Sequence, residues 1–150
     1  MTSQHADDVE AAVRRYFTVV ADLGSSDADL RAIVHPEVQL VERPNLLNPA
    51  GRHADAAAVL HGFRAGKTLL REQSFELHEI LVSGDRAAVR ATWQGVLATD
   101  AGHLPADSRL TAQVGAFLTV RDGQVLQHET FDCFEPPAPA LSTAVVERAT

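Results

Sequence analysis

The sequence predicts an α+β fold: a cone-shaped α+β barrel with three N-terminal helices packed on the concave face of a curved, mostly antiparallel sheet. Apolar residues recur at helical spacing in much of the first 67 residues, and they alternate by about two from residue 73 onward. Short turn motifs separate the alternating segments, which is typical of antiparallel strands joined by hairpins. Because the helices come first and the strands follow, the helices are expected to cover one face of the sheet.

The first part of the chain contains three segments with helical periodicity and one with a strand pattern. Acidic residues open the first helical segment and Gly24 follows its end, as the helix dipole and the C-cap preference favour. Ser26 is a suitable N-cap for a short second helix, which the His35–Pro36 pair ends. The expected elements are helices at 7–23, 25–34 and 53–67, a first strand at 37–43 and a loop at 44–51.

The second part of the chain alternates as four long strands. The motifs SGD at 83–85 and RDG at 121–123 are typical of tight hairpins, and a longer loop spans 100–107. Strands of ten or more residues twist and curl, so the sheet is expected to wrap around the helices and leave a hollow suited to a small molecule. The strands are expected at 73–82, 86–98, 108–120 and 124–134.

Length and composition restrict the class of protein. The 150 residues are expected to form one domain at 1–135, followed by a flexible Pro/Ala-rich tail at 136–150. A net charge of −7 without a basic stripe argues against nucleic-acid binding. No apolar run is long enough to span a membrane and the N-terminus does not resemble a targeting peptide, so the expected compartment is the cytoplasm. The single cysteine, Cys133, forms no internal disulfide and the histidines lack ligand spacing, so neither a metal nor a cofactor is expected.

Four stretches carry a resemblance to a known superfamily: AAVRRYF at 11–17, HPEVQLVER at 35–43, VSGDRAAVRATWQG at 82–95 and FLTVRDGQVLQHETFD at 117–132. In this order they resemble the nuclear transport factor 2-like superfamily, which includes ketosteroid isomerases, scytalone dehydratase, limonene epoxide hydrolase and SnoaL-like polyketide cyclases. The resemblance covers residues 7–135. It implies the fold rather than the activity, because this fold hosts isomerases, dehydratases, hydrolases, cyclases and binding modules.

The first helix and the end of the first strand contain two candidates for catalysis. The resemblance places Tyr16 where the ketosteroid isomerases carry their oxyanion-hole tyrosine, with a hydrogen-bonded core residue as the alternative. Glu42 corresponds to their general base when the strand is counted from the second helix, and Arg43 does when it is counted back from Pro44. A carboxylate at 42 in an apolar pocket would have a raised pKa and could transfer protons near neutral pH. The alternative is an ordinary Glu–Arg pair at the rim or on the surface.

The last strand supplies the other two catalytic candidates. Counted from Gly123 and compared with the isomerases, it directs His128, Thr130 and Asp132 into the cavity and the residues between them outward. Asp132 matches an essential aspartate of the SnoaL-like cyclases, and His128 is expected to face it across a bound ligand, as acid and base. Thr130 is expected to contact the substrate. The alternatives are that Asp132 caps a turn or pairs with an arginine, and that His128 is a satisfied polar group at the cavity mouth.

Other elements are expected to supply the substrate-binding wall. Trp93, the sole tryptophan, is expected to face the cavity as a flat apolar surface. Gly115 corresponds to the second oxyanion acid of the isomerases, so their paired oxyanion hole, and with it steroid isomerase activity, is not expected. Gln113 and Phe117 share that strand face and are expected to line the pocket, together with Phe63 from the third helix.

Two kinds of function fit this pattern. The first is a cofactor-independent enzyme of the isomerase, dehydratase or cyclase type, which acts on a hydrophobic small molecule by general acid–base chemistry. The alternative is a non-catalytic module that binds a small molecule or dimerises, and a second alternative is a hydrolase similar to the epoxide hydrolases. The resemblance also implies a homodimer that pairs through the outer sheet face, with Phe131, Val41 and the tail as contributors.

Overall fold

Nine helices and strands form the fold in the computed structural model, which describes residues 3–136. The helices are α1 (Ser3–Ala21), α2 (Asp27–Ile33) and α3 (Ala56–Leu69). The strands are β1 (Val34–Glu42), β2 (Arg52–Ala54), β3 (Leu70–Ser83), β4 (Arg86–Leu97), β5 (Arg109–Arg121) and β6 (Gln124–Phe134). Of the tail predicted at 136–150, only Pro136 is among the described residues. Within the described range no helix is long and apolar enough to cross a membrane.

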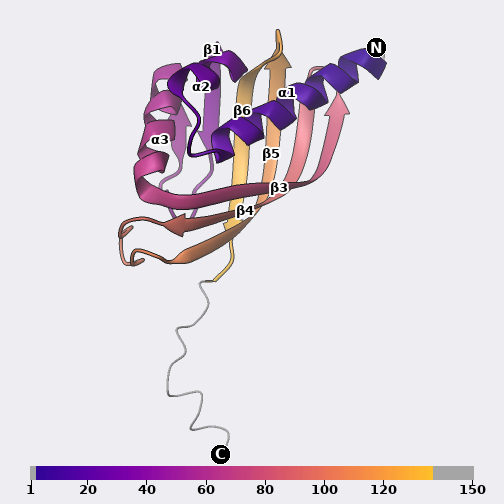
Figure 1. Ribbon diagram of the computed structural model, residues 1–150. Coiled ribbons are helices and arrows are strands. Elements are labelled where there is room, and N and C mark those ends of the chain that lie inside the picture. The colour runs from indigo at the N-terminus through magenta and orange to yellow at the C-terminus, as the bar shows by residue number, and fades with distance from the viewer. Residues whose placement is uncertain (1–2, 137–150) are drawn as a thin grey trace, which may run out of the picture.

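The strands form one curved sheet, and the three helices lie across its concave face (Figure 1). The strand order is β2-β1-β6-β5-β4-β3. Only the β1–β6 pair is parallel among the neighbouring strands of the described chain, and the other four pairs are antiparallel. The predicted α+β fold with a curved, mostly antiparallel sheet is therefore confirmed. The sheet is open, with β2 and β3 at its edges.

The region between β1 and β3 differs from the prediction. Residues 53 and 54 were expected in the third helix, but residues 52–54 pair with β1 as β2, with Leu40 opposite Ala54. The third helix begins later, at Ala56, because the Asp55 side chain caps it by accepting a hydrogen bond from the backbone N–H of Ala58 at 2.9 Å. β3 begins at Leu70, where the backbone turns directly from α3 into the extended conformation.

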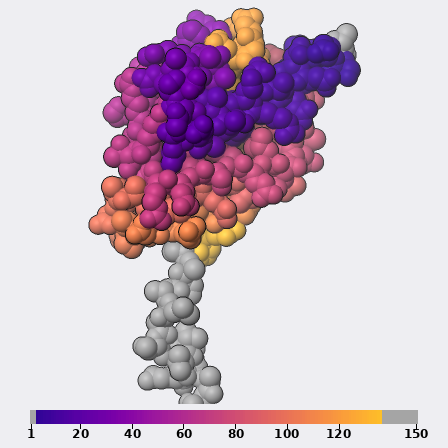
Figure 2. All heavy atoms as spheres, viewed as in Figure 1, coloured from indigo at the N-terminus to yellow at the C-terminus, as the bar shows by residue number. Residues whose placement is uncertain are grey.

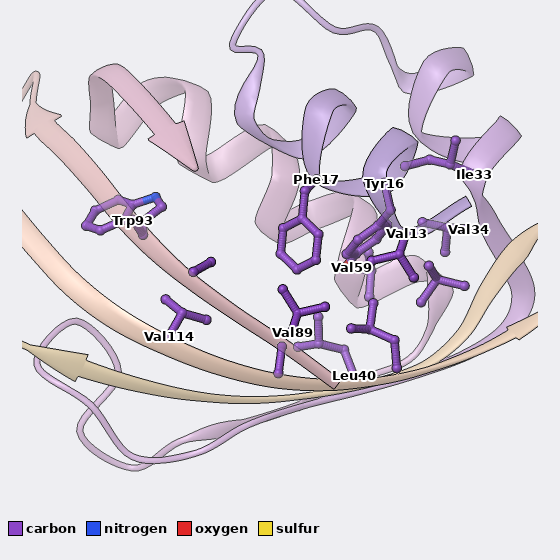
Figure 3. Close-up of a cluster of buried hydrophobic side chains, with 14 of the residues drawn as sticks. Val13, Tyr16, Phe17, Ile33, Val34, Leu40, Val59, Val89, Trp93 and Val114 are labelled. Carbon is purple, nitrogen blue, oxygen red and sulfur yellow. The ribbon is translucent and has the colours of Figure 1, made fainter. Parts of the chain in front are cut away.

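The core lies between the helices and the concave face. In Figure 3 the side chains of Tyr16 and Phe17 point from α1 toward Val89 and Leu40 on the sheet, and all four are buried. The space-filling view shows α1 and α2 across the upper part of this side of the molecule, with later segments of the chain below them (Figure 2). Along β5, buried and more exposed residues alternate strictly, so the sheet has an apolar inner face and a distinct outer face.

Candidate functional site

The concave face and the helices enclose a cavity of about 260 Å³. Its lining combines an aromatic set with a polar one. The aromatic set, apart from Tyr16, is Phe17, Phe75, Trp93 and Phe134. The polar set, which includes every ionisable side chain of the lining, is Tyr16, Glu42, Asn45, Asn48, Arg52, Gln73, His128, Thr130 and Asp132. A hollow of this kind, apolar with a few convergent polar groups, is the usual form of a small-molecule site.

Trp93 is held in the cavity wall by its neighbours. Its indole Nε1 donates to Oε1 of Gln73 at 2.9 Å. The amide nitrogen of Gln73 in turn donates to the carbonyl oxygens of Val20 and Ala21 at the end of α1, at 3.0 and 3.3 Å. A Cβ atom at Gly95 would lie 2.5 Å from two carbons of the indole ring, so only glycine leaves room for it. The ring is thus fixed both by a hydrogen bond and by packing.

Tyr16 and His128 form a buried hydrogen-bonded pair. The Tyr16 hydroxyl lies 2.8 Å from Nδ1 of His128, and the two rings meet edge to face. Burial raises the pKa of the Tyr16 phenol well above its ordinary value and lowers the pKa of His128 to about 4. Both side chains are therefore neutral at pH 7. The other ring nitrogen of His128, Nε2, is buried and has no hydrogen-bond partner among the described residues.

Asp132 is a carboxyl group with one close hydrogen-bond donor. Thr130, two residues earlier on the same strand face, donates its hydroxyl to Oδ1 of Asp132 at 2.6 Å. Burial raises the pKa of Asp132 and the nearby Glu42 carboxylate raises it further, whereas the Thr130 hydrogen bond opposes the shift. The first effect is the largest, so Asp132 holds its proton to higher pH than a solvated aspartate does.

Glu42 faces the same cavity, but its carboxylate accepts hydrogen bonds from three side chains. The side-chain amides of Asn45 and Asn48 both donate to Oε1 of Glu42, at 2.9 and 2.8 Å, and Nε of Arg52 approaches Oε2 at 3.3 Å. Arg43 points to the other side of the sheet, where its Nε donates to Glu129 at 3.0 Å. Of the two positions that the sequence left open, 42 is therefore the one in the cavity.

The sequence itself matches a family with this architecture. Residues 13–128 match the model of the SnoaL-like domain. The chain belongs to this family. The predicted membership of the nuclear transport factor 2-like superfamily is thereby confirmed. The sequence has no significant match among curated proteins.

Solved structures share the fold of this SnoaL-like domain at low sequence identity. IdmH from Streptomyces antibioticus, a candidate polyketide cyclase, has a TM-score of 0.67 at 18% identity, covering 83% of this chain and 91% of its own. A candidate SnoaL-like polyketide cyclase from Jannaschia sp. CCS1 has a TM-score of 0.70 at 16% identity, covering 88% and 90%. An LEH-like epoxide hydrolase of Mycobacterium tuberculosis has a TM-score of 0.65 at 12% identity, covering 87% and 84%. At these identities the likeness concerns the fold alone.

The SnoaL-like fold brings most of the predicted site residues together. All four catalytic candidates, Tyr16, Glu42, His128 and Asp132, line the cavity, as do Trp93 and Thr130. Phe63 lies beside it, in the wall of an adjoining cavity of about 140 Å³ that shares Tyr16 and Arg52 with the first. The catalytic and substrate-binding roles of these residues stay predictions.

The placement of Gln113 and Phe117 in the cavity is wrong. Both lie on the outer face of β5, and the Phe117 side chain is 48% exposed, whereas Ala112 and Val114 line the cavity instead. The β5 alternation is uninterrupted, and its inward-facing residues are the apolar set Leu110, Ala112, Val114, Ala116, Leu118 and Val120. The expected face came from counting back from the hairpin in comparison with the isomerases, and an error of one residue in such a count moves every residue of the strand to the opposite face. Gly115 therefore lies on the outer face as well and cannot stand in for an oxyanion acid.

Three polar lining residues were missed because they lie in the irregular segment that follows β1 or in the short strand β2. Asn45 and Asn48 come from a turn-rich stretch, and Arg52 comes from the short strand β2. Their spacing carries no periodic pattern, and the pairing of β1 with β2, which places Arg52 opposite Glu42, brings them to the cavity. Across the described residues, no group of three or more His, Cys, Asp and Glu side chains could hold a metal ion.

Proposed function

We propose that this protein is an enzyme that moves protons on a small hydrophobic molecule held in the cavity, without a cofactor. The observation that carries the proposal is the Asp132 carboxyl group, whose pKa is raised by burial in an aromatic-walled cavity. A carboxylate whose pKa is raised is a stronger base than a solvated aspartate, so it can take up a proton from a substrate and return it. Isomerisation, dehydration and aldol-type cyclisation all require such a transfer.

In this proposal Asp132 is the base and then the acid. Its ionised form removes a proton from a carbon next to a carbonyl group, and the electron pair of the broken C–H bond moves onto the carbonyl oxygen as an enolate forms. Asp132 then returns the proton to another carbon, or to a leaving hydroxyl group that departs as water. The proton count balances in both cases, and no oxidant or reductant is needed.

The Tyr16–His128 pair stabilises the enolate oxygen in the same proposal. Because His128 is neutral, one of its ring nitrogens carries a hydrogen. We assign that hydrogen to Nδ1, which donates to the Tyr16 oxygen 2.8 Å away and leaves the Tyr16 hydroxyl free to donate into the cavity. A buried neutral donor aimed at a developing oxyanion contributes to catalysis because it is already oriented. Glu42, bound by Asn45 and Asn48, orders the loop that closes the cavity and is not the base in this scheme.

Deuterium exchange tests the proposal without knowledge of the natural substrate. The protein is incubated with 2-tetralone, a small bicyclic ketone, in D₂O, and the loss of protons next to the carbonyl is followed by NMR. Exchange above the buffer rate is expected, and Asp132→Asn should lower it by about 10²-fold or more. Glu129→Gln, on the outer face of the same strand, is the matched control and should exchange as the unchanged protein does. Equal exchange by the Asp132→Asn variant would remove Asp132 from the mechanism.

A non-catalytic binding module is the second candidate. It is favoured by the lack of a second oxyanion acid, since Gly115 stands at the corresponding position and lies on the outer face of β5. In that case ligands raise the thermal unfolding temperature but are recovered chemically unchanged after long incubation. A hydrolase related to the epoxide hydrolases would instead convert styrene oxide to its diol.

We also propose that two copies pair through the outer sheet face. The proposal is supported by Phe117 and Phe131, which are 48% and 41% exposed there and stack edge to face with centroids 6.2 Å apart. Val41 lies beside Phe117 in the wall of a shallow groove on this face. The tail, which was expected to contribute, lies outside the described residues.

A further inference from the structure

Arg52 brings a permanent positive charge into the cavity wall. It lies at the start of β2, opposite Glu42, and lines both the main cavity and the adjoining one. Its side chain is 36% exposed, so the guanidinium is partly shielded from water. No other Lys or Arg occurs among the residues that line the main cavity in the described chain. Its salt bridge with the largely buried Glu42 accounts for one N–H group of the guanidinium, and the proposed proton transfer uses none of the others.

The contact with Glu42 leaves most of the guanidinium unused. Only Nε of Arg52 approaches the carboxylate, at 3.3 Å, which is longer than an ordinary hydrogen bond of about 2.7–3.2 Å. Glu42 already receives the amides of Asn45 and Asn48. Neither Nη1 nor Nη2 of Arg52 has a hydrogen-bond partner among the described residues. Because a guanidinium has five N–H donors, four remain available to a ligand.

The helix next to Arg52 leaves room for its guanidinium. A Cβ atom at Gly62 of α3 would lie 2.2 Å from Nη1 of Arg52 and 3.2 Å from Cζ. A glycine inside a helix is unfavourable relative to alanine, so the sequence gives up helix stability at this position. The space that results holds the Arg52 guanidinium where the two cavities meet.

The two cations that line the cavities differ in the donors that they leave available to a ligand. Burial raises the pKa of Tyr16, and the positive charge of Arg52 opposes this rise because the guanidinium lies near the phenol. Lys67, the cation of the adjoining cavity, is engaged by the carbonyl of Ser25 and lies 4.5 Å from the ring centroid of Phe63. Arg52 therefore offers donors that Lys67 does not.

We propose that Arg52 anchors a carboxylate of the ligand, so that the cavity takes a planar, apolar molecule with one carboxylate group. The Nη atoms bind the two carboxylate oxygens in the bidentate geometry that suits a guanidinium. The flat apolar part lies against Trp93 and the phenylalanines of the lining. The inference rests on the proposed function only in that a small molecule occupies this cavity, and it holds whether or not the molecule is converted.

Calorimetric titration with two matched probes tests this assignment. The probes are 2-naphthoate and its neutral isostere 2-naphthamide, which differ at the carboxylate and share the ring system. The unchanged protein should bind 2-naphthoate about 10-fold or more tightly than 2-naphthamide, because hydrogen bonds between charged groups are the stronger ones. Arg52→Met should abolish the difference, and Arg43→Met, on the opposite sheet face, should leave it in place.

Gly62→Ala keeps the positive charge of Arg52 but shifts the position of its guanidinium. The new methyl group displaces the guanidinium, which is the end of a flexible side chain, so the fold is retained and the unfolding temperature stays equal or rises. The preference for 2-naphthoate should fall several-fold, and this variant decides the question if Arg52→Met does not fold. The inference is overturned if neither probe binds, if the two probes bind equally to the unchanged protein, or if the preference survives in Arg52→Met. The proposed proton transfer is judged separately, by deuterium exchange in the Asp132→Asn variant.

Discussion

Burial acts in opposite directions on the Tyr16 phenol and the His128 imidazole. It raises the pKa of an acid that would become negative and lowers the pKa of a base that would become positive. The pair therefore stays neutral and is joined by one hydrogen bond instead of an ion pair. Asp132 and Glu42, the two carboxyl groups of the cavity, differ in their hydrogen-bond partners. Glu42 has three donors, whereas Asp132 has one, and Asp132 is the carboxyl group left with capacity for chemistry.

The buried His128 makes stability depend on pH. Its pKa of about 4 in the folded protein lies below the value of about 6.5 for an unfolded chain, so between these values the unfolded state binds more protons. The free energy of unfolding is therefore highest above about pH 6.5 and falls as the pH falls toward 4, by on the order of 3 kcal/mol. Urea unfolding at a series of pH values measures this slope, and His128→Gln should reduce it. A slope that is the same in both proteins would show that His128 is not the group responsible.

At the scale of elements, the segment between β1 and β2 organises the polar part of the site. The Asn45 side-chain carbonyl accepts hydrogen bonds from the backbone N–H groups of Leu47 and Asn48 at 2.9 and 3.0 Å, which fixes the turn. Its amide donates to Glu42, as described above. The segment ends at Gly51, which has a φ of +70° and packs closely against the carbonyl oxygen of Glu42. A short loop and a strand end thus hold one another in place.

Gly51→Ala should therefore destabilise the protein more than an ordinary glycine substitution does. A Cβ atom would lie 2.8 Å from the Glu42 carbonyl oxygen and the residue would keep its positive φ, for a combined loss of roughly 2–4 kcal/mol in the free energy of unfolding. Gly102→Ala is the matched control, because Gly102 has a φ of +60° but no atom within 4 Å of the added Cβ. It should lose only about 1 kcal/mol. Similar losses in the two variants, measured by urea unfolding, would show that the contact with Glu42 is not strained.

The elements with regular periods were the ones that the sequence could predict. The alternation of β6 is regular over 127–134, so the inward direction of His128, Thr130 and Asp132 followed from it. β5 alternates as regularly, but its faces were predicted by counting back from the hairpin in comparison with the isomerases and not from its own alternation of apolar residues. β2 and its Arg52 were missed for a different reason. A three-residue strand has no period of its own, and its existence depends on pairing with β1.

At the scale of the whole molecule, all three helices lie on one face of an open sheet, and the other face carries aromatic side chains. Phe117 and Phe131 stack there, and the guanidinium of Arg43 lies 5.8 Å from the ring centroid of Phe131. Arg43 also pairs with Glu129, so charged groups border the aromatic pair. Aromatic residues and arginine are enriched where proteins associate, and an apolar centre with a charged border is typical of such surfaces. This face is the one that we propose for the dimer.

Phe131→Glu tests that arrangement, because it places a charge at the centre of the proposed interface. Light scattering coupled to size exclusion should give the mass of a dimer for the unchanged protein and of a monomer for the variant. The fold should be retained, since Phe131 is 41% exposed within one chain, and ligand binding should persist because the cavity lies on the opposite face. Leu46→Glu is the control, since Leu46 is 36% exposed on the loop after β1 rather than on the sheet, and it should leave the dimer intact. A monomeric unchanged protein, or a dimeric Phe131→Glu variant, would show that the outer face does not join two copies, and the exposed aromatic pair would then need another explanation.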